Sequence, residues 1–249
     1  MRSCEYVQEQ ASGLDLVITV SFNRRQSGGN VASYGQTFLP GAGRIIQCDA
    51  CVSEGAEWLA AQDSRFADAL KLTGPLPLRR KPDGFAELLS AIVSQQVSVA
   101  SAKAIWARMK AARLTGPRKI LWATDEELRA AGLSRQKIRY ARALAEARID
   151  FKALRDVPDA EVIARLVEVP GIGVWTAEIY AMFSLGRADV FAHGDLALQE
   201  AARVLFDLPA RPKDRELRQM AEDWSPWRSV AARILWAYYR VAKDREGIR

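Results

Sequence analysis

The sequence has 249 residues, of which 49% are hydrophobic and 27% are charged, which is typical of a soluble globular protein. A chain of this length buries enough surface to fold without a disulfide framework or a structural metal. Its longest apolar stretches are far short of the roughly 20 residues that a membrane-spanning helix needs, so an integral membrane protein is excluded.

Charge and rare residues narrow the remaining functions. The chain carries 36 Lys and Arg against 30 Asp and Glu, a net charge of +6, which points weakly to a polyanionic partner. The three cysteines, Cys4, Cys48 and Cys51, form a sparse and odd set that suits a reducing compartment, so we expect a cytoplasmic protein. They are too few for a zinc site, and the single histidine, His193, excludes centres built from two or three imidazoles.

The first 54 residues differ in composition from the rest. They hold all three cysteines, no Lys and no Trp, and the only run that resembles a strand is Leu16–Phe22. We therefore predict a loosely ordered N-terminal extension over residues 1–54, followed by a helical domain over residues 55–249. His193 is expected to be a loop residue or a contact to the polyanionic partner rather than a catalytic base.

Apolar residues recur at helical spacing from residue 56 onward, and no useful strand-like alternation appears there. Thr124 and Glu127 form a capping box at the start of one of these helices. The pattern predicts an all-α fold with about ten helices. They are Glu57–Leu72, Phe85–Gln96, Val99–Leu114, Thr124–Ala131, Arg135–Arg148, Pro158–Val167, Trp175–Leu185, Asp195–Phe206, Pro212–Asp223 and Pro226–Lys243.

Two short segments carry the chemistry. Val169–Gly173 reads VPGIG between two predicted helices, where glycines allow a tight turn and the next helix offers unpaired N–H groups to a phosphate. Gly194-Asp195 stands at a later helix start, where an aspartate is an ordinary N-cap. An N-cap carboxylate is also hydrogen-bonded by backbone N–H groups, which suits a charge that stabilises a developing cation. Neither segment alone decides between a connecting turn and a functional site.

Together these segments resemble the helix-hairpin-helix DNA glycosylases, in which a hairpin LPGIGxxTA is followed about twenty residues later by an aspartate. The resemblance continues in the family's order over Leu88–Ser98 (IxxQQxS), Gly132–Lys137 (GLSxxK) and Trp224–Trp236 (WxPWRSxA…W). It is specific to the 3-methyladenine DNA glycosylase II type. Residues 1–54 are too few for the N-terminal β domain of longer members, so the resemblance implies the compact form.

The resemblance implies a two-lobed helix-hairpin-helix DNA glycosylase fold, with the hairpin at about residues 162–185 and Asp195 as the catalytic residue in the cleft. The base pocket would be lined by Trp175 and Trp236, with Ile179 where the family has a tyrosine and Tyr180 beside it. Bifunctional relatives carry a lysine where Trp175 stands, so the implied enzyme is monofunctional and leaves an abasic site. The implied DNA contacts are Gln96, as the wedge in the minor groove, and Gly171, Gly173, Val174 and Thr176 in the hairpin.

The predicted function is therefore base excision repair of alkylated purines, 3-methyladenine and 7-methylguanine, in double-stranded DNA. We expect a monomer associated with the nucleoid and needing no cofactor, with or without a monovalent cation bridging hairpin and phosphate. Two alternatives stay open from the residues: a non-catalytic helix-hairpin-helix DNA-binding module, and a glycosylase for deaminated or oxidised bases.

Overall fold

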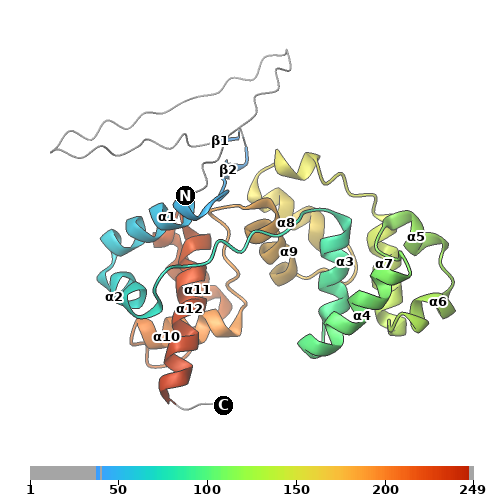
Figure 1. Cartoon of the computed structure of the whole chain (residues 1–249). Helices are drawn as coiled ribbons and strands as arrows, with labels where there is room; N and C mark the ends of the chain where they lie inside the picture. The colour runs from blue at the N-terminus through green and yellow to red at the C-terminus, as the bar shows by residue number, and fades with distance from the viewer. Residues whose placement is uncertain (1–37, 40, 247–249) are drawn as a thin grey trace, which may run out of the picture.

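The computed structural model describes residues 38–39 and 41–246, and within them the fold is helical apart from one small hairpin (Figure 1). Strands β1 (Phe38–Leu39) and β2 (Gly43–Arg44) form that antiparallel hairpin. The all-α prediction is thus confirmed. The strand predicted at Leu16–Phe22 lies outside the described residues.

The end of the predicted extension belongs to the packed structure. Helix α1 (Asp49–Gln62) begins before residue 55, so the predicted boundary falls inside a helix. Ile46 and Val52 are buried, and the Ile46 N–H donates to the Gly186 carbonyl over 2.7 Å. The unusual composition of this segment concealed the few apolar side chains that anchor it.

The first lobe is built from helices at both ends of the described chain. Helices α1, α2 (Ser64–Thr73), α10 (Leu196–Leu205) and α12 (Arg228–Glu246) pack together (Figure 1). Beside them lie α11 (Asp214–Met220) and the 3₁₀ turn η3 (Ala221–Trp224). The single helix predicted over Glu57–Leu72 is two helices, because the Asp63 carboxylate accepts from the Arg65 N–H and caps a new one.

The second lobe is formed by the middle of the chain, from α3 (Phe85–Ser94) through α4 (Val99–Ala111) to α7 (Arg135–Glu146). Between them lie α5 (Pro117–Trp122) and α6 (Asp125–Ala130). The capping box of Thr124 and Glu127 is confirmed. Helix α5 was not predicted, because Gly116-Pro117 is both a stop signal and a favourable helix start with proline in the first turn.

Helices α8 (Asp159–Val167) and α9 (Val174–Tyr180) lie between the two lobes in Figure 1, with the 3₁₀ turn η1 (Ala153–Arg155) before them. Helix α9 continues into a π-helical segment, η2 (Ala181–Leu185), which ends at Gly186. This two-lobed arrangement is the predicted one. Within the described part of the chain, no helix has the length and apolar character required to span a bilayer.

Candidate active site and nucleic-acid interface

The turn between α8 and α9 contains two glycines with different surroundings. Gly171 has φ +94°, and a Cβ added there would lie 2.4 Å from Cγ of Tyr140 on α7. Gly173 has no atom within 4 Å of such a Cβ, and the following Val174 is 42% exposed. The fold itself therefore requires Gly171, whereas Gly173 leaves the backbone open to an outside partner.

The start of α9 offers backbone donors to that side. The first backbone hydrogen bond of the helix itself runs from the Ala177 N–H to the Gly173 carbonyl, and no side chain caps the helix. Free N–H groups at the positive end of a helix attract phosphates. The predicted contacts at Gly171, Gly173 and Val174 lie together on this turn. The Thr176 side chain, by contrast, is buried, and only its backbone belongs to this exposed helix start.

The Asp195 carboxylate is held by four N–H donors. As the N-cap of α10, its Oδ1 accepts from the backbone N–H groups of Ala197 and Leu198 at 2.9 and 3.1 Å. The indole Nε1 of Trp175 donates to Oδ2 at 2.9 Å, and that of Trp236 donates to Oδ1 at 3.3 Å. The structure thus brings the predicted catalytic residue and both predicted pocket tryptophans into direct contact.

A buried polar network lies behind Asp195. Nδ1 of His193 is 2.9 Å from Oε1 of Glu178 on α9, and Nε2 of the same ring contacts Nη2 of Arg218 on α11. The hydrogen bond to Glu178 raises the pKa of His193 above its ordinary value. His193 lies in the loop before Asp195, and its buried side chain connects that loop to Glu178 and Arg218. The spacing of Glu178 and His193 in the sequence did not predict this contact.

A cavity of about 230 Å³ opens between α3 and α9. Trp175, Ile179 and Tyr180, the residues predicted for the base pocket, line this cavity together with the buried Thr176. Trp236 and Asp195 do not line the cavity. Asp195 is connected to it by its hydrogen bond with the indole of Trp175, which lies in the cavity wall. Its other lining residues are Lys81, Glu87, Leu88, Ser90, Ala91, Ser94, Gln95 and Ser184.

The aromatic residues at the site differ in exposure and in the contacts that their side chains already make. Trp175 is 48% exposed, whereas Tyr180 is buried and its hydroxyl accepts from the Gly84 N–H at 2.8 Å. Burial raises the pKa of Tyr180 to about 12, so this residue is a neutral part of the cavity wall. Trp236 packs against Phe183, with ring centroids 5.8 Å apart. The exposed face of Trp175 is thus the clearest stacking surface for a base.

Two neighbouring glutamines end α3 with separate roles. Nε2 of Gln95 donates to the Gly171 carbonyl at 2.8 Å, which ties the hairpin to the second lobe. Gln96, the predicted wedge, is exposed and has φ +54°. Sequence reasoning missed Gln95, although the repeated glutamine was the available signal.

Lys81 is a further cavity residue that sequence reasoning missed, and its Nζ is paired with Oε1 of Glu87 at 2.8 Å. Among the described residues no group of three or more His, Cys, Asp or Glu side chains is placed to hold a metal. That the protein needs no metal or cofactor stays a prediction.

Comparison with known proteins agrees with this geometry. The S. pombe "DNA-3-methyladenine glycosylase 1" is 32% identical over 203 residues, covering 77% of this chain and 89% of the relative. Its solved structure, Mag1 in complex with abasic DNA, superposes with a TM-score of 0.65 at 31% identity over 74% of this chain and 95% of that one. A DNA-3-methyladenine glycosidase from Bacillus halodurans gives a TM-score of 0.69 at 36% identity, covering 74% and 88% of the two chains.

A family model also matches residues 89–226, a span that contains the end of α3, the hairpin, Asp195 and α11, and that stops before α12. The match covers more than half of the chain and includes Trp175 and Asp195, whereas Trp236 and the cavity residues Lys81, Glu87 and Leu88 lie outside it. This chain belongs to the HhH-GPD superfamily of base excision DNA repair proteins.

Proposed function

We propose that this protein is a DNA glycosylase that hydrolyses the N-glycosidic bond of alkylated purines in duplex DNA. The observation that carries the proposal is the Asp195 carboxylate, held by two backbone N–H groups and two indoles beside an aromatic-walled cavity. The relatives named as 3-methyladenine glycosylases support the substrate class.

The chemistry follows from the leaving group. A purine alkylated at N3 or N7 is already cationic, so it departs with little acid assistance and leaves a sugar with oxocarbenium character. A carboxylate fixed in place before the reaction stabilises that positive charge while water attacks the sugar. Because the N–H donors hold both Asp195 oxygens, the carboxylate needs little reorganisation as the charge develops.

The cavity suits a base that has left the helix. A base inside a duplex cannot reach Asp195, so the nucleotide must be extruded. The space of about 230 Å³ is on the scale of one nucleobase, and the exposed Trp175 ring lies at its wall. A cationic base gains from stacking on an electron-rich indole.

The enzyme is expected to be monofunctional, since Trp175 stands where a lysine nucleophile would be needed. Lys81 is the lysine that lines the cavity. Its amine is paired with the Glu87 carboxylate and so is not free to act as a nucleophile. Borohydride trapping on abasic DNA tests this expectation. No covalent adduct should form with the wild type, and an adduct lost in Lys81→Ala would assign lyase activity to Lys81.

We further propose that the protein acts as a monomer on double-stranded DNA and associates with the nucleoid in the cytoplasm. The abasic DNA bound to Mag1 supports a DNA partner. The hairpin would grip a backbone phosphate through Gly171, Gly173 and Val174, with or without a bridging monovalent cation, and no other cofactor is needed.

The deciding experiment measures release of 3-methyladenine and 7-methylguanine from methylated duplex DNA by wild type and Asp195→Asn. Asparagine is as good an N-cap as aspartate, so the fold should persist. Release should fall by about 10²–10³-fold, the range for removing one preorganised electrostatic group. Asp63→Asn is a matched control, because Asp63 also caps a helix, α2, but its carboxylate pairs with Arg65 and contacts neither tryptophan.

Two results would overturn the proposal. If the wild type binds DNA and releases neither base, deaminated and oxidised bases are the next substrates to assay. If Asp195→Asn binds and acts as the wild type does, the aspartate is only a cap and a DNA-binding module becomes the better description.

A further inference from the structure

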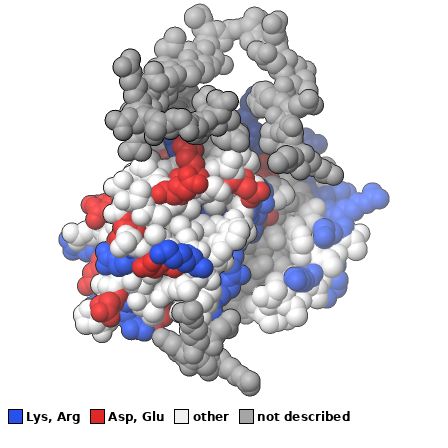
Figure 2. Space-filling view, turned by 60° about the vertical axis from the view of Figure 1, so that its left-hand side comes forward, with Lys and Arg blue, Asp and Glu red and all other residues white. Residues whose placement is uncertain are grey.

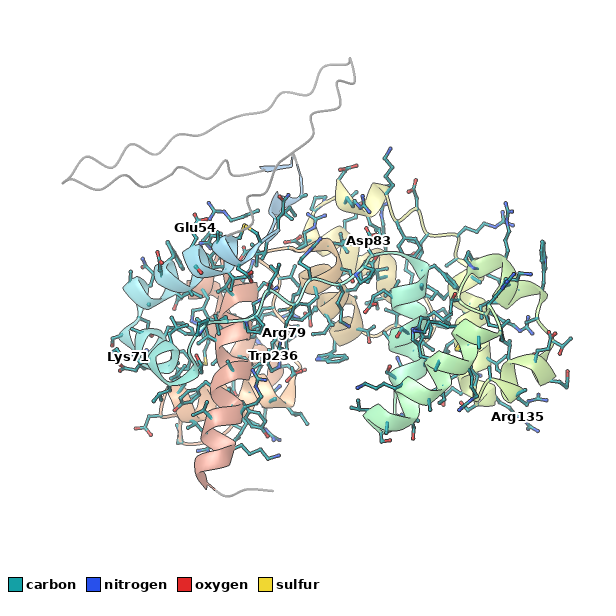
Figure 3. The ribbon with its side chains drawn as sticks, viewed as in Figure 1. Glu54, Lys71, Arg79, Asp83, Arg135 and Trp236 are labelled. Atoms are coloured by element: carbon teal, nitrogen blue, oxygen red, sulfur yellow. The ribbon has the colours of Figure 1, made fainter. Side chains whose placement is uncertain are left out.

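Four arginines gather on the first lobe where it faces the second. Arg79 and Arg80 belong to the connector between α2 and α3, and Arg233 and Arg240 lie seven residues apart on α12, which puts them on one helix face. Trp236, the partner of Asp195, lies between them on that face. Figure 3 shows Arg79 beside Trp236 at the side of the lobe that faces the cleft.

Arg233 organises this group, which we call the arginine strip. It is 2% exposed, and its Nη1 donates to the carbonyl and hydroxyl of Ser229. Its Nη2 donates to the Leu78 carbonyl at 3.2 Å, directly before Arg79 in the chain. The buried guanidinium thus holds the connector against α12 at Leu78. The next residue, Arg79, has a left-handed backbone with φ +53°.

The strip has no acidic partner of its own. Among the described residues, none of the four arginines forms a salt bridge. The nearby Asp83 attracts Arg80, but its carboxylate is 2.6 Å from Arg155 and pairs with that arginine. The Asp195 carboxylate is occupied by its own four donors. Elsewhere on this lobe Figure 2 shows acidic and basic side chains mixed over the outer face.

Burial, and after it mutual repulsion, lowers the pKa of two arginines in the strip. Burial and the charges of Arg79 and Arg80 lower the pKa of Arg233 to about 10. Burial and Arg240 likewise lower the pKa of Arg79. Like charges held together without a counter-charge destabilise a fold, so a bound anion would relieve the repulsion.

We propose that Arg79 and Arg240, arranged around Arg233, bind the backbone phosphates that flank the extruded nucleotide. The inference rests on the proposed function, which places the sugar of that nucleotide at Asp195. The phosphates on either side of a nucleotide are one sugar away from its glycosidic bond, and Trp236 links Asp195 to the strip. The strip and the hairpin would then hold the strand from opposite lobes.

Binding of undamaged duplex, and of duplex with a tetrahydrofuran abasic analogue, tests the strip by anisotropy at several salt concentrations. Arg79→Ala and Arg240→Ala should each lower the salt slope by about one and weaken binding by about tenfold. Thermal stability should be unchanged or higher, since repulsion is removed. Lys71→Ala is the matched control, because Lys71 pairs with Asp68 on α2 and lies at the outer edge of the lobe (Figure 3).

A second measurement identifies which phosphates of the strand the arginines contact. Neutral methylphosphonates placed singly on either side of the abasic analogue should remove the difference between wild type and Arg79→Ala, since both changes delete one contact. The inference is overturned if the slope and affinity of both arginine variants match those of Lys71→Ala, or if only distant methylphosphonates couple to Arg79. Because the readout is binding, failure of base release would count against the proposed function alone.

Discussion

The hairpin turn at residues 168–173 and the Asp195 loop at residues 191–195 each lead into a helix of the site, yet they are held in opposite ways. The hairpin is supported from behind by Tyr140 and Gln95, and its outward side is bare. The Asp195 loop is held by buried polar groups, and both carboxylate oxygens already accept hydrogen bonds. A backbone that binds phosphate must leave its donors free, whereas a carboxylate that stabilises charge must be fixed in advance.

The largest effect expected from this contrast is on stability. Gly171→Ala forces a side chain into a left-handed backbone at φ +94° and against the Tyr140 ring. Strain and overlap together should lower the free energy of unfolding by about 3 kcal/mol or more, measured by urea denaturation. A loss below about 1 kcal/mol would mean that the turn shifts easily and that Tyr140 does not define it.

Gly173→Ala, the matching substitution at the other glycine of the hairpin, should have a smaller effect, and it should appear in DNA binding rather than in stability. No atom lies within 4 Å of the added Cβ, so stability should change by less than about 1 kcal/mol. The methyl group would instead obstruct a phosphate approaching the α9 N–H groups, and duplex binding should weaken by about tenfold. Unchanged binding would remove the hairpin backbone from the DNA interface.

The support of the Asp195 loop should depend on pH. The pKa of His193 is raised above its ordinary 6.5 by Glu178, so the pair stabilises the fold below pH 6.5 and loses this contribution as pH rises through the folded value. Glu178→Gln should therefore cost about 1 kcal/mol at low pH and less at high pH. Thermal unfolding of both proteins from about pH 5 to about pH 8 measures the difference.

Arg218 provides the competing outcome, because its guanidinium contacts His193 Nε2 and must release it when the ring is protonated. A difference between wild type and Glu178→Gln that does not vary with pH would show that His193 stays neutral. Nδ1–H would then donate to Glu178 while Nε2 accepts from Arg218.

The helices were predictable where their signals are local. The capping box at Thr124 and the spacing of apolar residues placed most elements, since these patterns depend only on near neighbours. The break at Asp63 and the start of α1 were missed, because a cap inside a helical pattern and a short anchoring segment act through contacts that spacing does not encode.

The residues of the site likewise fall into those that the sequence indicated and those that only the structure shows. The resemblance indicated Asp195, Trp175 and Trp236, and the structure brings their polar atoms together. The arginine strip joins residues from distant parts of the chain, and the buried Glu178–His193 pair joins a helix to a later loop, so only the folded arrangement reveals them. The burial of Thr176 and Tyr180 likewise follows from packing against the second lobe.

The smallest expected effect concerns the longer of the two indole contacts with Asp195. Trp236→Phe keeps a ring against Phe183 but removes the N–H that donates to Oδ1 at 3.3 Å. The single-turnover rate of base release should fall by about threefold, because the other three donors still orient the carboxylate. Trp122→Phe, at a 74% exposed position on the second lobe, controls for loss of an indole in general. A rate that rises instead would mean that the indole withdraws charge from Asp195, so that orientation and charge density compete at this carboxylate.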